Sequence, residues 1–221
     1  MKLFHHLTIT GFLCFSLAAG AQEIRIQPYT GLAVDYIILA GSFDGTSFFT
    51  TDDETILVPK LKPDFGYGFL FGFKMGKGAV DFAYHISFME YTSMEDGFSG
   101  KSTSHFIRYL SYKRHFNTPE EKKFIPYIDF DLSIAFSHFE KISYPLYQQS
   151  EILSANYGGV IFGIGVGSQL YLTERLTLDL KILPELYIGT DIRAKGSERY
   201  EIAKFSNFLL INSIGLNYYF N

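Results

Sequence analysis

The sequence predicts an all-β fold: an eight-stranded antiparallel up-and-down transmembrane β-barrel. Three observations predict it. Apolar and polar residues alternate with a period of two over most of the chain. The connections between these segments alternate between long and short. After the N-terminus no apolar run approaches the roughly 18 residues that a membrane-spanning helix requires.

The N-terminus, residues 1–21, is predicted to be a cleaved secretory signal peptide. Lys2 supplies the positive start, residues 7–18 form an apolar stretch too short to span a bilayer, and Ala19-Gly20-Ala21 is a small-x-small cleavage site. Residues 22–221 are then one barrel domain. The only cysteine, Cys14, lies in the leader, so disulfides and thiolate zinc sites are not expected in the mature chain.

Charge and composition narrow the function. Without Lys2 the chain carries 18 basic and 23 acidic residues, a formal charge of −5, and it has no basic block. Nucleic acid is therefore not an expected partner, and we predict neither a metal site nor a cofactor. The chain has 23 Phe and 16 Tyr but no Trp, so Phe and Tyr would occupy the membrane interfaces.

The first two predicted strands, 24–38 and 65–75, show the alternation clearly. In the first, apolar residues take even positions, whereas Arg25 and Asp35 lie on odd ones. In the second, aromatic residues take odd positions, opposite glycines and Lys74. Charged and apolar residues therefore belong to opposite faces of each strand.

The next two strands are predicted at 79–91 and 104–116. The first sets Val and aromatic residues at even positions against Asp81 and other polar residues at odd ones. The second has no clean apolar face, and we expect Arg108 and Arg114 to point inward.

The remaining strands are predicted at 124–139, 157–172, 176–192 and 208–220, with apolar residues at even positions in each. Short turns at 76–78, 117–123 and 173–175 alternate with longer loops at 41–63, 92–103, 140–155 and 193–206. This pattern is typical of membrane barrels, with short periplasmic turns and four longer extracellular loops.

The placement of charges decides which face is inside. Outside the ambiguous fourth strand, the mid-strand charges share the polar face, and a basic residue facing lipid near the midplane costs about 2–4 kcal/mol. Eight strands leave an interior that side chains just fill. We therefore expect a lumen plugged by salt bridges, with a small proton or ion path as the alternative. The predicted lumen network is Arg25, Asp35, Lys74, Asp81, Arg108, Asp129, Asp131, Asp179, Lys181 and Glu185.

Glycines 163, 165 and 167 form a side-chain-free stretch on the inward face of the strand 157–172. Bulky residues such as Tyr127 or Tyr187 are expected to pack against this wall. A secreted, soluble lipocalin-like barrel is the alternative fold, and it would need apolar residues inside and polar residues outside.

The last strand resembles the C-terminal recognition strand of bacterial outer-membrane barrels. Ser213 is followed by Gly215, and Tyr218 and Phe220 come three and five positions after the glycine. The resemblance implies that the barrel-insertion machinery binds this strand, that the strand closes the barrel, and that the protein resides in the outer membrane among its lipids.

Residues 112–116 and 124–127 resemble the fourth and fifth strands of the PorT-like outer membrane β-barrel family, an eight-stranded OmpA-OmpX-like layout. Some members of that family assist protein secretion. The resemblance implies a barrel domain and says little about its role. We expect a non-catalytic role, structural or in binding an unknown partner through the loops, with envelope biogenesis or protein secretion as candidate settings.

His85-Ile86-Ser87 is the best indication of an enzyme, because His and Ser two apart share a strand face. An outer-membrane lipid A deacylase family uses a similar His-x-Ser pair, near the C-terminal end of its barrel and facing lipid. Here the pair is in the third strand and on the lumen face, which favours a structural role. A lipid-modifying hydrolase remains the alternative function.

Overall fold

The structure is a computed structural model that describes residues 26–41, 48–51, 54–57, 60–92, 99–119, 122–146, 149–194 and 205–220. The predicted leader, its cleavage site and Arg25 lie outside these ranges. Within them, no helix has the length and apolar character needed to cross a membrane.

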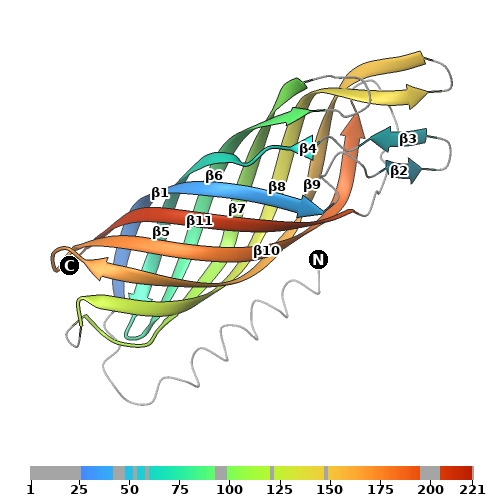
Figure 1. Ribbon diagram of the computed structural model, residues 1–221. Helices are drawn as coiled ribbons and strands as arrows, with labels where there is room; N and C mark the ends of the chain where they lie inside the picture. The colour runs from blue at the N-terminus through green and yellow to red at the C-terminus, as the bar shows by residue number, and fades with distance from the viewer. Residues whose placement is uncertain are drawn as a thin grey trace.

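Eight long antiparallel strands close a barrel (Figure 1), as the sequence predicts. The closure is made by the last strand, which pairs with the first from Tyr29↔Tyr219 to Gly41↔Asn207. The strands are β1 (Ile26–Gly41), β5 (Asp64–Met75), β6 (Gly78–Thr92), β7 (Ser99–His115), β8 (Phe124–Leu146), β9 (Gln149–Tyr171), β10 (Leu176–Ala194) and β11 (Phe205–Tyr219).

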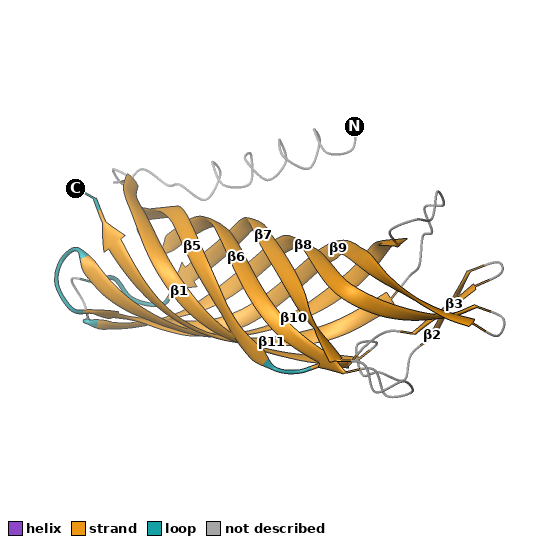
Figure 2. Cartoon of the chain, turned by 90° about the horizontal axis from the view of Figure 1, so that it is seen from above, coloured by secondary structure: helices purple, strands orange, loops and turns teal. Residues whose placement is uncertain are grey.

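Three short strands lie in the first long connection. β2 (Phe48–Thr51) and β3 (Glu54–Leu57) form a hairpin, and β4 (Lys60–Leu61) pairs with β6. Figure 2 shows the barrel strands inclined to the long axis, with β2 and β3 beyond one end and the C-terminus at the other. We call these the long-loop end and the short-turn end.

The third predicted loop, 140–155, is wrong: β8 continues to Leu146 and β9 begins at Gln149, so a paired hairpin replaces it. The second loop is also shorter than expected, because β7 begins at Ser99. Where neither face of a strand meets lipid, apolar and polar residues need not alternate. Strands β8 and β9 can therefore stay paired beyond the residues at which the alternation in the sequence stops.

The two faces of the barrel differ as the alternation requires. Leu32, Ile164 and Val166 point outward with 65%, 62% and 59% of their surface exposed. Asp129 and Asp179, on the other face, are buried. This is the reverse of the distribution in a water-soluble barrel.

Strand β7 changes face at a β-bulge, where the register with β8 shifts between Arg108 and Leu110. Before the bulge Arg108 is buried, and after it the inward residues are Ser111, Lys113 and His115. Arg114 is exposed on the outer wall, so its predicted inward position is wrong. The bulge inserts one residue and reverses the alternation, which is why neither face of this segment is uniformly apolar in sequence.

The interior is layered along the axis. A stacked Tyr29–Tyr219 pair, with ring centroids 4.7 Å apart, lies at the short-turn end. Charged residues fill the middle. Towards the long-loop end follows an apolar cluster that includes Ile37, Phe106, Phe139 and others. This apolar layer at the long-loop end was not expected from the sequence, where only a polar inward face is predicted.

Candidate functional site

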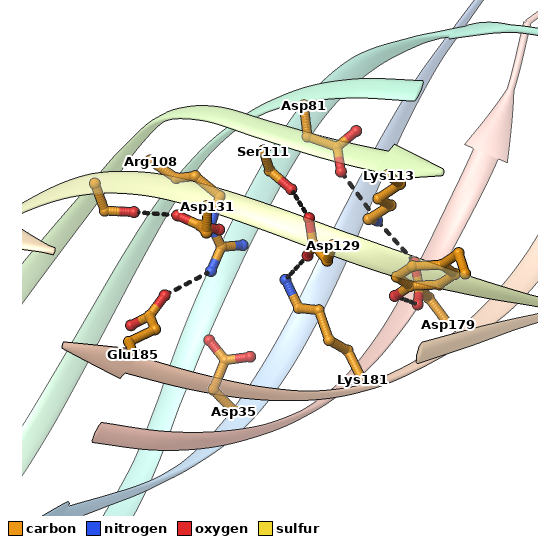
Figure 3. A network of polar contacts seen from close by, with 12 residues as sticks. Asp35, Asp81, Arg108, Ser111, Lys113, Asp129, Asp131, Asp179, Lys181 and Glu185 are labelled. Atoms are coloured by element: carbon orange, nitrogen blue, oxygen red, sulfur yellow. Dashed lines mark hydrogen bonds and ion pairs between the residues drawn. The ribbon is translucent and has the colours of Figure 1, made fainter. Parts of the chain in front are cut away.

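The charged middle layer of the barrel is the candidate site (Figure 3). Lys113, on β7, lies at its short-turn side. Its Nζ is 2.9 Å from Asp81 Oδ2 on β6 and 2.9 Å from Asp179 Oδ2 on β10. One cation thus bridges two carboxylates from strands on opposite sides of the lumen, which ties the barrel walls together.

Hydroxyl and amide groups donate further hydrogen bonds to these two carboxylates. Tyr29 donates a hydrogen bond to Asp81, and Tyr127 OH donates to Asp179 Oδ1 at 2.5 Å. The side-chain amides of Gln169 and Asn217 both donate to Asp179 Oδ2 at 3.3 Å. Buried charges are tolerated when they are paired and hydrogen-bonded in this way.

Asp129 forms the centre of the network. Lys181 Nζ donates to its Oδ2 at 3.0 Å, and Ser111 Oγ donates to its Oδ1 at 2.7 Å. Both carboxylate oxygens of this fully buried residue therefore have a partner from another strand.

Arg108 organises the side nearer the long-loop end. Its guanidinium pairs with Asp131, and its Nη2 is 3.8 Å from Glu185 Oε1. Its Nη1 lies 3.4 Å from His85 Nε2, while His85 Nδ1 contacts Asp35. Ser133 Oγ donates to Asp131 Oδ1 at 2.6 Å.

Lys74 lies near the short-turn end, beside two tyrosines. Its Nζ donates to Tyr171 OH at 2.6 Å and is 5.0 Å from the centroid of that ring and 5.8 Å from that of Tyr219. Aromatic rings at these distances attract a cation through their π faces.

Two close approaches explain why glycine is needed on β9. A Cβ on Gly167 would lie 2.4 Å from Tyr127 Cζ, so Tyr127 packs on the glycine stretch as predicted. The ring of Tyr187 instead covers Gly159, where a Cβ would lie 2.4 Å from Tyr187 Cε2.

The sequence-predicted network is brought together on the inward face, except Arg25, which lies outside the described residues. Asp35, Lys74, Asp81, Arg108, Asp129, Asp131, Asp179, Lys181 and Glu185 are all buried there. Sequence reasoning missed Lys113, because it follows the bulge in β7. Among the described inward residues there are six carboxyl groups and four Lys or Arg cations. Lys113 and Arg108 each contact two carboxylates, so two of the four cations are shared.

His85 and Ser87 do not form a nucleophile–base pair in the structure. Asp35 binds one imidazole nitrogen of His85, and the Arg108 guanidinium lies at the other. Ser87 Oγ is buried and makes no hydrogen bond within the described chain. The described residues also contain no group of three His, Cys, Asp or Glu placed to hold a metal ion.

A small cavity lies where the charged layer meets the apolar layer. Asp35, His85, Arg108 and Glu185 line one side of it, and Ile37, Phe106 and Ile211 the other. Its volume is about 10 Å³, at the lower limit of the roughly 10–15 Å³ that one water molecule requires.

No protein-family model matches the sequence, and no curated protein matches it. The fold, however, resembles solved outer-membrane barrels. Neisserial surface protein A covers 87% of this chain and 97% of its own, with a TM-score of 0.52 at 13% identity.

Two further barrels support the same conclusion. AlkL, solved in lipid bilayers, matches with a TM-score of 0.55 at 11% identity, over 92% of this chain and 94% of its own. OprG from Pseudomonas aeruginosa matches with a TM-score of 0.52 at 12% identity, over 89% of this chain and 95% of its own. The chain thus has the fold of these closed barrels. The PorT-like resemblance stays at the level of the sequence motifs described above.

Proposed function

We propose that this protein is an integral outer-membrane β-barrel whose lumen is closed and whose role is non-catalytic. The observation that carries the proposal is the division of faces: ion-paired carboxylates and cations inside, and a continuous apolar surface outside. Lipid stabilises such a surface, whereas water would not. The outer-membrane barrels that share the fold support the same compartment.

In this proposal the short turns face the periplasm and the long-loop end faces outward. The closing strand, with Tyr218 and Phe220 on the outer wall, is the segment that the barrel-insertion machinery would bind. Outer-membrane lipids surround the wall. The extended β8–β9 hairpin and the β2–β3 hairpin (Figure 1) offer backbone at the surface for a protein or ligand partner. Envelope biogenesis or protein secretion, as the PorT-like resemblance implies, would use this end.

A closed lumen follows from its filling. Ion pairs bridge the walls in the middle layer, and aromatic residues pack on both sides of it. An open diffusion path would require charges without partners or a wide aqueous space.

The proposal is tested by expressing the full chain, isolating outer membranes and comparing boiled with unboiled samples on a gel. We expect outer-membrane recovery with heat-modifiable migration, and no unit conductance in planar bilayers. A soluble periplasmic product would contradict the membrane assignment, and stable channel openings would contradict the closed lumen.

The second candidate is a lipid-modifying hydrolase, and the Asp35–His85 contact favours it because an Asp often orients a catalytic His. Phospholipid or lipid A turnover by purified protein, abolished in His85→Ala, would support it. Absence of turnover alongside normal heat-modifiable migration would leave the non-catalytic role.

A further inference from the structure

A groove of about 500 Å³ crosses strands β7, β8 and β9 near the long-loop end of the wall. Its outward lining includes Phe136, half exposed, and Val160 from the apolar belt, with His105, His138 and Asn156 towards the loops. This volume lies within the range of about 300–1,000 Å³ that is usual for ligand sites.

The groove exists because one outward position has no side chain. Across the strands, Phe136 pairs with His105 on one side and with Gly158 on the other. Gly158 therefore leaves a gap in the belt beside Phe136, at the level where the belt ends.

The loop-side rim of the groove can both accept and donate hydrogen bonds. His138 Nδ1 lies 2.7 Å from Asn156 Oδ1. An amide oxygen only accepts, so with this amide orientation His138 carries a proton on Nδ1. In the neutral tautomer that carries this proton, Nε2 is an acceptor, and the Asn156 amide nitrogen is a donor. Tyr84 OH and His105 Nδ1, 2.6 Å apart, add a second polar pair beside the groove.

None of the ten residues that line the groove is Asp, Glu, Lys or Arg. A phosphate or carboxylate would find no Lys or Arg side chain among them. The chemistry that fits is a hydrocarbon chain ending in an uncharged group with donors and acceptors, such as a hydroxyl, ester or amide.

We propose that this groove binds the acyl chain of an outer-leaflet glycolipid, with its amide, ester or hydroxyl group at His138 and Asn156. The inference deepens the proposed function, since it rests on this wall facing lipid. The chain lies along Val160 and Phe136, continuous with the apolar belt, and the linkage group sits at the end of the belt.

The test uses the full-length barrel purified in detergent, incubated separately with lipid A and with phosphatidylethanolamine, and then measured by native mass spectrometry. Gly158→Leu fills the groove with a side chain that suits the apolar wall. Val166→Phe, on the same strand but outside the groove, is the matched control. His138→Ala with Asn156→Ala removes the polar rim, and heat-modifiable migration verifies that each variant is folded.

We expect wild type and Val166→Phe to retain one lipid A molecule tightly. We expect Gly158→Leu and the rim variant to lose at least about ten-fold in lipid A affinity. Equal lipid A retention by folded wild type and folded Gly158→Leu would overturn the groove while leaving the membrane assignment intact. Preferential retention of phosphatidylethanolamine would overturn the glycolipid assignment. A wild-type dimer that Gly158→Leu converts to a monomer would show a contact between copies instead.

Discussion

At the scale of single residues, the interior is stabilised by cations shared between carboxylates. Lys113 contacts Asp81 and Asp179 at 2.9 Å each, and all three are buried. Removing one partner from such a group leaves charges without compensation in a medium of low dielectric. The stability of the barrel therefore depends on a few bridging side chains.

Lys113→Met is expected to destabilise the folded barrel by about 3–5 kcal/mol, because it leaves two buried carboxylates without their cation. Urea titration of the detergent-folded protein, followed by heat-modifiable migration, measures this. The matched control is Lys62→Met. Lys62 pairs with Glu90 at 3.5 Å in an exposed position, so its loss should cost about 0–1 kcal/mol. Equal effects of the two variants would contradict the bridging role.

Two glycines on the inner wall should respond differently to the same methyl group. A Cβ on Gly167 would lie 2.4 Å from the Tyr127 ring and 2.7 Å from the backbone oxygen of Leu180, whereas on Gly215 its nearest neighbour is 3.4 Å away. Gly167→Ala is expected to cost about 1–3 kcal/mol through overpacking, and Gly215→Ala much less. Unfolding midpoints of the two variants provide the comparison, and a larger loss in Gly215→Ala would refute this packing.

At the scale of strands, the sequence predicts where each strand lies and which of its side chains point inward, wherever the alternation of apolar and polar residues is unbroken. The positions of Asp129 and Asp179 could be assigned in advance, because both belong to strands with a strict period of two. Lys113 could not, since a bulge leaves no clear signature in a single sequence. The β8–β9 extension was missed because strands outside a membrane need no alternation. The pairing of charged residues depends on how strands on opposite sides of the lumen are aligned, and the residues of a single strand do not determine that alignment.

Because of the bulge in β7, two arginines of this strand should differ in their contribution to stability. Arg108 is buried beside Asp131 and Glu185, whereas Arg114 is on the outer wall. Arg108→Leu should destabilise the barrel by about 3–5 kcal/mol, and Arg114→Leu should change stability by about 0.5 kcal/mol or less. Unfolding in urea tests both variants, and the reverse order would mean that the register of β7 is wrong.

The closing strand gives a prediction about assembly. Tyr218 and Phe220 point outward on β11 and just beyond it, where they contribute little to the interior. The double variant Tyr218→Ala, Phe220→Ala should accumulate less folded barrel in cells. It should still refold from urea into detergent micelles with nearly the wild-type yield. Equal losses in cells and in micelles would indicate a role in stability rather than in recognition by the insertion machinery.

At the scale of the whole molecule, the barrel is a cylinder with a filled centre. Tyrosines at the short-turn end, ion pairs in the middle and an apolar cluster at the long-loop end succeed one another along the axis. The layers combine two ways of filling a narrow barrel. Ion pairs hold opposite walls together, and apolar packing limits the access of water to them. The filled centre leaves the outer wall and the loop end as the surfaces available for function.

The central claim is that lipid surrounds this barrel and that its polar groups lie inside. Adjacent residues on β8 test it directly, because Leu132 is outward and Ser133 is buried in the lumen. With Cys14 replaced by Ser, single cysteines at these positions are offered a spin label after the barrel is folded in lipid bilayers. We expect the Leu132→Cys label to collide readily with oxygen and poorly with a water-soluble nickel complex, and Ser133→Cys to resist labelling. The account would be contradicted if Ser133→Cys were labelled and its label collided readily with oxygen, as a lipid-facing label does, while Leu132→Cys resisted labelling.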